Sequence, residues 1–244
     1  MYFRQVLHAE KACASYLVGC PTRGVCAVVD PQGDPRTYVQ QAAENGMTVT
    51  AVIDTHVHAD HVSCARQLAA ASGAPLYLGM GAGVQFAYVG LDEGQVLDVG
   101  NRRVRVVRTP GHTAEHVCLV VDGWFVLTGD TLFVGDVGRV DLALDHLPGD
   151  AIRARAADLY RSLQRLLELP EWTEVYPGHF AGSVCGRGMD GKPITTIGRE
   201  RRHNPALQLT EEAFIAYQTG APPPLPPDFR AIKQRNLGAW QPQL

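Results

Sequence analysis

The stretch THVHADH, residues 55–61, follows directly on the apolar run Val49–Ile53. It places three histidines and an aspartate in one turn after a predicted strand, and side-chain packing does not explain that combination. Imidazoles so crowded repel one another when protonated and compete for the same water when neutral. A bound metal ion removes this conflict, so the stretch predicts a metal site.

Three further segments repeat the arrangement, because in each an apolar run ends in a turn that carries a histidine or an aspartate. The runs and the side chains that follow them are 104–107 with His112, 124–127 with Asp130, and 174–176 with His179. Functional side chains gather on loops that a rigid scaffold holds at one edge. We therefore expect the turns that follow these four runs to meet at one edge of the sheets and to form an active site there.

Short apolar runs rich in valine and bounded by glycine, proline or aspartate predict strands. They cover residues 14–18, 26–29, 49–53, 76–78, 104–107, 117–121 and 124–127. Helical spacing predicts helices over residues 35–45, 62–72 and 150–169. Asp122-Gly123 is a two-residue hairpin signal, which places antiparallel pairing in the middle of the chain. The pattern favours a mixed β-sandwich with helices outside over a doubly wound parallel sheet.

The composition is that of an ordinary globular protein and limits the function classes. Of the 244 residues, 45% are hydrophobic and 19% are charged, and the formal net charge is -3. The absence of a lysine or arginine block argues against a nucleic-acid partner. No window approaches the roughly 20 uninterrupted apolar residues of a membrane span, and the N-terminus lacks a secretory pattern. We expect a soluble, cytoplasmic protein whose 6 cysteines are reduced and mostly buried.

We expect one domain over residues 1–244, with a C-terminal extension from about residue 180. Residues 178–191 are rich in glycine, and residues 222–227 form a proline-rich run that is typical of polyproline conformation. A short helix is predicted over residues 211–219. No internal repeat is evident, and nothing in the pattern requires a second domain.

The ordered set of metal-type side chains resembles the ligand pattern of the metallo-β-lactamase superfamily. The set is His56, His58, Asp60, His61, His112, Asp130 and His179. This resemblance extends from about residue 12 to about residue 209. It implies an α/β (α+β) fold, the αβ/βα sandwich, in which two mixed β-sheets pack face to face and are flanked by helices. It also implies a first metal position at His56, His58 and His112, a second at Asp60, His61 and His179, and a bridging Asp130.

Two branches of this mainly hydrolytic superfamily remain open, and two sequence segments favour one of them. Glyoxalase II is a dinuclear thioester hydrolase, whereas persulfide dioxygenase is a mononuclear iron enzyme. Gly138-Arg139-Val140-Asp141 resembles the Gly-Arg-x-Asp element of persulfide dioxygenases. Residues 181–188, 196–200 and 204–207 are similar to a loop of their bacterial members. Val137 departs from the mitochondrial-type enzymes, which often have cysteine there.

The persulfide dioxygenase resemblance implies one Fe(II) per chain, held by His56, His112 and Asp130 with open positions for a sulfur anion and O2. The groups expected to orient ligands and water are the catalytic residues His58, Asp60, His61 and His179. The implied reaction oxidises glutathione persulfide, or a similar low-molecular-weight persulfide, with O2 to sulfite and thiol. The alternative is a glyoxalase II-like hydroxyacylglutathione hydrolase with two zinc ions. A metal-binding sensor is a third and weaker interpretation.

Substrate binding is expected at Arg139 and Arg187, because an arginine fork binds a carboxylate of glutathione in a bidentate manner. Arg139 also has a structural alternative, an ion pair with Asp141 or Asp136. Cys185 is expected to be an inert loop thiol, and His116 a packed residue rather than a ligand. The expected partners are the persulfide and O2. The resemblance leaves open a homodimer and a functional link to a rhodanese-type sulfurtransferase.

Overall fold

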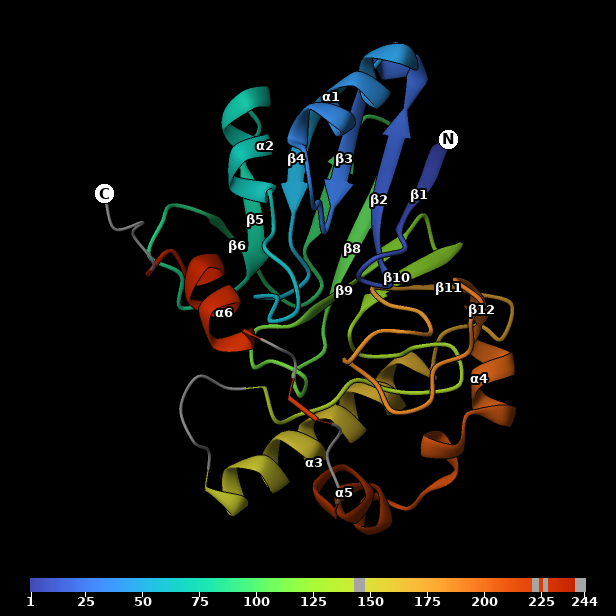
Figure 1. The fold of residues 1–244 in the computed structure, drawn as a ribbon. Coiled ribbons are helices and arrows are strands. Elements are labelled where there is room, and N and C mark those ends of the chain that lie inside the picture. Colours follow the sequence, from blue (N-terminus) through green and yellow to red (C-terminus); the bar gives the residue numbers. More distant parts are fainter. Residues whose placement is uncertain (143–147, 221–223, 226–227, 240–244) are drawn as a thin grey trace.

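Two six-stranded sheets pack face to face in this computed structural model, which describes residues 1–142, 148–220, 224–225 and 228–239 (Figure 1). Most of the proline-rich run predicted over residues 222–227 lies outside the described residues. The first sheet has the spatial order β1 (Tyr2–His8), β2 (Cys13–Cys20), β3 (Val25–Val29), β4 (Thr48–Ile53), β5 (Leu76–Gly79), β6 (Val89–Leu91). The second has the order β12 (Thr195–Thr196), β11 (Glu174–Pro177), β10 (Phe125–Gly129), β9 (Val117–Val121), β8 (Arg102–Arg108), β7 (Val96–Val99).

Both sheets are mixed, as the sequence predicted. In the first sheet β3, β4, β5 and β6 are parallel neighbours, whereas β1, β2 and β3 pair antiparallel. In the second sheet only β10 and β11 pair in parallel. The predicted hairpin joins β9 to β10, and its central residues Asp122 and Gly123 have φ values of 50° and 69°. Two successive left-handed residues give the turn the twist that a hairpin requires.

Helices cover the outer face of each sheet (Figure 1). On the first sheet lie α1 (Pro35–Glu44) and α2 (Ala65–Ser72), and on the second lie α3 (Gly149–Leu166) and α5 (Glu211–Gly220). The shorter elements are η1 (Pro21–Arg23), α4 (Ile197–His203), η2 (Pro205–Gln208) and α6 (Phe229–Leu237). The predicted helix 62–72 begins only at Ala65, because Ser63 forms a β-bridge with Gln32 and its hydroxyl accepts the Ala65 N–H.

The apolar core has three layers, one between the sheets and one under each pair of helices. Strand β9 shows how a single strand serves two of them, since Leu119 faces the layer between the sheets and Val120 faces the layer under α3. Side chains alternate between the faces of a strand, so a strand covered on both faces must be apolar throughout. This explains the unbroken valine-rich runs of the sequence. The αβ/βα sandwich with two mixed sheets is confirmed.

Helix α6 lies at the same edge as residues 55–61 and was missed by the sequence analysis, because its surface is largely polar and half exposed. The Asn236 amide donates to the carbonyl oxygens of His58 at 2.9 Å and His61 at 2.8 Å. Its Oδ1 accepts the Ser63 N–H at 3.0 Å. One side chain of α6 thus satisfies three backbone groups of the histidine-rich loop.

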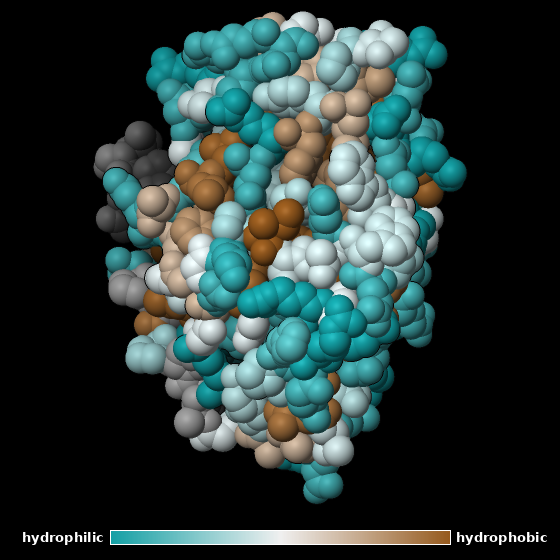
Figure 2. Space-filling view, turned by 90° about the vertical axis from the view of Figure 1, so that its right-hand side faces the viewer, coloured by the Kyte–Doolittle hydropathy of each residue, from teal (hydrophilic) through white to brown (hydrophobic). Residues whose placement is uncertain are grey.

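No helix of the described ranges is a candidate for spanning a membrane. None of the helices within them combines the length and apolar composition that crossing a membrane requires. The face shown in Figure 2 is mainly hydrophilic, and its apolar residues lie in small groups. Isolated apolar groups of this kind are ordinary on a protein surface.

Replacing Asn236 by alanine should loosen the histidine-rich loop. Two carbonyls and one N–H lose their partner, so we expect the free energy of unfolding to fall by about 1 to 3 kcal/mol. Urea unfolding measures this loss, and amide exchange should quicken at residues 58–63. Gln234→Ala, on the exposed side of the same helix, is the control. Equal effects of the two substitutions would show that Asn236 does not hold the loop.

Candidate metal centre

The loops that leave β4, β8, β10 and β11 meet at one edge of the two sheets, as the sequence predicted. Each loop brings one or more of the predicted residues into a buried polar cluster. Ligand-type atoms of His56, His112 and Asp130 lie within 4.8 Å of one another, and each of these residues is 1% exposed. Three strands distant in sequence therefore supply one compact group.

His56 presents its Nε2 atom to this group because its other nitrogen is engaged. The Thr55 hydroxyl donates to Asp30 at 2.9 Å, so its oxygen accepts from His56 Nδ1 at 3.0 Å. The proton is therefore on Nδ1, and the lone pair of Nε2 points toward Asp130 Oδ2 at 3.9 Å. Burial, together with the charges of neighbouring imidazoles, holds the pKa of His56 well below its ordinary value. The ring is a neutral donor of electrons, as a metal ligand must be.

His112 is fixed in the same way by a backbone carbonyl. Its Nδ1 donates to the carbonyl oxygen of Arg139 at 2.7 Å, and its Nε2 lies 3.5 Å from Asp130 Oδ2. Gly138 allows the chain to approach so closely, because a Cβ there would lie 1.8 Å from the Asp130 carbonyl oxygen. The Gly-Arg-x-Asp segment singled out in the sequence thus orients a ligand through its backbone.

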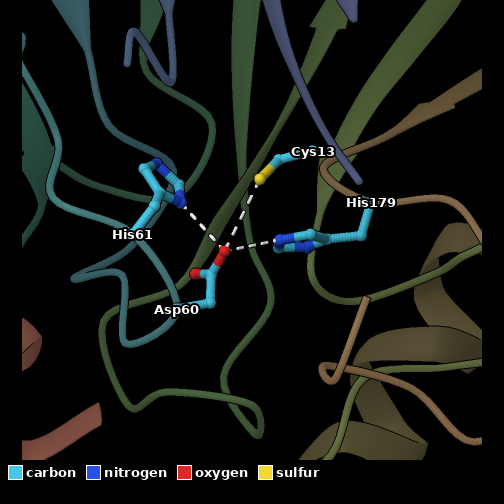
Figure 3. Close-up of side chains that lie close together, drawn as sticks. All are labelled: Cys13, Asp60, His61 and His179. Carbon is cyan, nitrogen blue, oxygen red and sulfur yellow. Dashed lines mark hydrogen bonds and ion pairs between the residues drawn. The ribbon is translucent and has the colours of Figure 1, made fainter. Parts of the chain in front are cut away.

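Asp60 is the hub of a second cluster beside the first (Figure 3). Its Oδ2 lies 2.9 Å from His61 Nδ1, 2.9 Å from His179 Nε2 and 3.7 Å from Cys13 Sγ. Burial raises the pKa of Asp60, but the charges of His61 and His179 outweigh burial and hold it well below its usual range. Burial lowers the pKa of His61, but Asp60 outweighs it and raises the value to about 10. The cluster is therefore a buried ion pair at neutral pH.

His179 joins the two clusters. Its Nδ1 lies 2.7 Å from Asp130 Oδ1 and its Nε2 lies 2.9 Å from Asp60 Oδ2. An ionised carboxylate only accepts hydrogen bonds, so both ring nitrogens donate and the ring is a cation. The carboxylates accordingly outweigh burial and hold the pKa of His179 well above its ordinary value. Gly178 admits this contact, since a Cβ there would lie 2.7 Å from Asp130 Oδ1.

His58 turns toward a third group of side chains. Its Nε2 lies 3.2 Å from Asp30 Oδ1 and 4.0 Å from Asp54 Oδ1, and its ring centre lies 4.2 Å from that of His56. Burial and the charge of His61 lower the pKa of His58, but the two carboxylates more than compensate and raise it. Burial raises the pKa of Asp54 to about 6. The carboxylates of Asp30 and Asp54 thus orient the His58 ring.

His116 supports Asp130 from the backbone side, in accord with the packed role expected for it. The Asp130 N–H donates to His116 Nε2 at 3.0 Å, and His116 Nδ1 lies 2.8 Å from the Thr109 hydroxyl. Burial and the charge of His112 lower the pKa of His116 to about 3. The ring therefore stays neutral and keeps accepting the Asp130 N–H.

The donor set fits a metal ion, because buried ligand atoms in it have no hydrogen-bond partner. These atoms are His56 Nε2, His58 Nδ1, Asp60 Oδ1, His61 Nε2 and Asp130 Oδ2. A buried polar atom without a partner costs free energy that a native structure rarely leaves uncompensated. Since these residues belong to clusters of ligand-type side chains, a cation in such a cluster resolves the cost for more than one atom.

The two predicted substrate anchors are engaged elsewhere. Arg139 is 1% exposed, binds Asp141 through two nitrogens at 2.6 and 2.7 Å, and donates to the carbonyls of Val184 and Pro224. These contacts correspond to the structural alternative of the sequence analysis. They leave its substrate-binding role a prediction.

Arg187 lies against α5, where its guanidinium donates to the Gln218 carbonyl at 3.1 Å and stacks 4.7 Å from the Tyr217 ring centre. Its backbone N–H donates to Asp136. These contacts hold the side chain on the helix rather than at the metal ligands. Its role as a substrate anchor likewise stays a prediction.

Two cysteines, Cys13 and Cys185, lie beside the metal-type side chains, and sequence reasoning did not place Cys13 there. Cys13 begins β2, where it forms an isolated bridge with His179, a long-range pairing that no local pattern reveals. Burial raises the pKa of the Cys13 thiol, but His179 and His61 outweigh burial and lower it to about 7. Cys185 lies within 4.8 Å of Asp130 and His179. Burial raises its pKa to about 12, which suits the inert thiol expected there.

A cavity of about 260 Å³ opens onto the second cluster. It is bounded by the turn between β1 and β2, by the loop after β11 and by the start of α6. Its lining includes Lys11, Asp60, Ser183, Asp228 and Ile232. The cavity gives a small molecule or ion a route from solvent to Asp60.

Comparison with known proteins supplies the family. Residues 9–179 match the model of the metallo-beta-lactamase superfamily. A hydroxyacylglutathione hydrolase of Polaromonas sp. strain JS666 is 32% identical over 254 residues, which cover 91% of this chain and 93% of that protein. Among solved structures, a metallo-beta-lactamase from Staphylococcus aureus superposes with a TM-score of 0.88 at 29% identity, covering 100% of this chain and 75% of that one.

A second solved structure, ETHE1 from Myxococcus xanthus, superposes with a TM-score of 0.84 at 32% identity, and covers 98% of this chain and 100% of that one. The matched range of the family model includes every predicted metal ligand, from His56 to His179. The fold, the edge at which the ligands gather and the match together lead to one conclusion. The chain belongs to the metallo-β-lactamase superfamily.

Proposed function

We propose that this protein is a persulfide dioxygenase, which oxidises glutathione persulfide or a similar small persulfide at a single non-haem iron. The observation that carries the proposal is the double hydrogen bond of His179. Because both its nitrogens donate to carboxylates, His179 acts as a cation beside Asp130 rather than as a lone-pair ligand. This leaves His56, His112 and Asp130, the two-histidine and one-carboxylate set typical of non-haem Fe(II) oxygenases.

The overall reaction consumes persulfide, O2 and water and yields thiol, sulfite and two protons. Bound Fe(II) would supply the electron transfer that activates O2 next to a sulfur anion. Asp60 lines the entry cavity, and its Oδ1 has no partner, so it can accept a hydrogen bond from the reacting water. His179 fixes one oxygen of Asp130, which leaves the other for the metal. The match to ETHE1 of Myxococcus xanthus over nearly the whole chain supports this assignment.

A second candidate function is a thioester hydrolase of the hydroxyacylglutathione hydrolase type with two zinc ions. The unpartnered atoms of the second cluster, Asp60 Oδ1 and His61 Nε2, favour it, as does the named relative from Polaromonas. The two clusters would hold the two metals, which would supply an activated water for thioester hydrolysis. The cytoplasmic location, the homodimer and the link to a rhodanese-type sulfurtransferase stay predictions under either function.

Metal content and paired assays separate the two functions. Protein purified without oxygen should contain about one iron per chain and should take up O2 when glutathione persulfide is added. It should release little thiol from S-lactoylglutathione. Efficient thioester hydrolysis by zinc-loaded protein, with no persulfide-dependent O2 uptake by iron-loaded protein, would establish the hydrolase instead.

Removal of a predicted iron ligand should remove the metal. We expect His56→Ala, His112→Ala and Asp130→Ala each to lose most bound iron and, with it, the O2 uptake, because two remaining ligands hold Fe(II) poorly. Iron analysis after gel filtration measures the loss. His203→Ala, on the exposed last turn of α4, is the control. Full iron occupancy in any of the three would mean that the ligand set is assigned wrongly.

Changes in the second cluster should affect turnover more than iron. We expect Asp60→Asn and His61→Ala to keep most of the iron while turnover falls about 10- to 100-fold, the usual effect of losing a side chain that supports metal ligands. Steady-state O2 uptake and iron content, measured on the same samples, test this. Parallel loss of iron and activity would place Asp60 and His61 among the iron ligands.

Arg139→Lys tests whether this arginine binds substrate or holds the loop. Lysine cannot reproduce the two-nitrogen contact with Asp141 or reach both carbonyls, so we expect lower thermal stability and lower iron occupancy through the displaced His112. The KM for persulfide should change little in the iron-loaded fraction. A raised KM with normal stability and iron content would instead establish substrate anchoring. Arg187→Lys, measured in parallel, tests the second predicted anchor.

A further inference from the structure

We infer that Cys13 adds a sulfur ligand to the second metal position of this superfamily, so that the second cluster favours a thiophilic divalent cation such as Zn²⁺. The four ligands are Cys13, Asp60, His61 and His179 (Figure 3). This inference goes beyond the proposed function, because it concerns the sulfur ligand of a second cation. The doubly protonated His179 of the proposed function belongs to the protein without that cation, which displaces the Nε2 proton when it binds. The inference also differs from the pattern expected from the sequence, which placed no sulfur at either position.

The geometry of the cluster is close to that of a four-coordinate site. One ligand atom from each of the four side chains lies within 4.8 Å of the others, and the distances from Asp60 Oδ2 are 2.9, 2.9 and 3.7 Å. Ligand atoms around tetrahedral zinc, with its usual bond lengths, lie roughly 3.3 to 3.6 Å apart. The distances from Asp60 Oδ2 therefore differ from those of a coordination sphere by only a few tenths of an ångström.

Unpartnered atoms in the same cluster are an independent sign of a cation. Asp60 Oδ1 and His61 Nε2 have no hydrogen-bond partner, and their residues are only 8% and 6% exposed. Asp60 Oδ1 has a lone pair that a cation can use, whereas the proton on His61 Nε2 must be displaced before that nitrogen can bind a cation. On binding, the cation replaces the proton of the Cys13 thiol and the protons on the ring nitrogens that ligate it.

The ligand types select the cation. A thiolate with two imidazoles and one carboxylate is a softer set than the two imidazoles and one carboxylate of the first position. Zinc binds such sulfur-containing sets tightly, whereas Mg²⁺ and Ca²⁺ prefer oxygen ligands. The cavity lined by Lys11, Asp60 and Ser183 supplies the entry path. The two positions thus differ in the metal that they favour.

Cobalt reports on sulfur ligation directly, because a thiolate bound to Co²⁺ gives an intense charge-transfer absorption in the near ultraviolet. The full chain, purified anaerobically with its iron, is titrated with Co²⁺. We expect this absorption in the wild type and its loss in Cys13→Ser and Cys13→Ala. It should persist in Cys26→Ala, a buried thiol of the outer core, and in Cys185→Ala, the other thiol near His179.

The affinity for zinc distinguishes a side chain that ligates the ion from one that only lies beside it. Cys13→Ser should weaken Zn²⁺ binding by more than the ~10- to 100-fold that loss of an outer partner costs. X-ray absorption of the zinc-loaded wild type should show sulfur at about 2.3 Å, which tests the inference even if the variants fold poorly. A wild type without sulfur in its zinc shell overturns the inference, as does a cobalt absorption lost in Cys185→Ala but kept in Cys13→Ala. Neither outcome bears on persulfide oxidation, which the assays of iron-loaded protein decide separately.

Discussion

The Asp130 carboxylate is the group on which the centre depends. One of its oxygens is held by His179 at 2.7 Å, its backbone N–H is held by His116 at 3.0 Å, and its other oxygen is left for a metal. Burial raises its pKa, but the cation of His179 outweighs burial and lowers the value to about 2. The two glycines that pass beside it, Gly138 and Gly178, leave no room for a side chain. Any change that moves Asp130 therefore disturbs both clusters.

Charge balance explains why the centre needs so many histidines. Asp60 and Asp130 are buried carboxylates, and a buried charge is tolerated only when it is paired and hydrogen-bonded. His61 and His179 supply the opposite charge, whereas His56, His112 and His116 are kept neutral by burial and by their neighbours. The same residue type thus performs two tasks in one cavity. The partner of the second nitrogen decides which task each ring performs.

Sequence reasoning identified the parts of the fold that local patterns encode. The strands of the core were predicted because burial on both faces demands unbroken apolar runs, as in β9, and the hairpin because Asp122-Gly123 suits left-handed backbone. The residues of the metal centre were found through their chemistry and through the resemblance to a family. Cys13 and Asn236 could not be found in this way, because their partners lie far away in sequence.

The hold of Asn236 on the histidine-rich loop has a consequence for synthesis of the protein. The asparagine lies 178 residues after His58, whose carbonyl it binds. Since ribosomes add about 5 to 20 residues per second, the loop is synthesised roughly 9 to 36 s before the asparagine that binds it. Asp130 and His179 are synthesised within that interval, before the residue that holds the loop. A chain that stops before residue 236 therefore lacks this contact, and it should exchange a bound metal faster than the 244-residue chain.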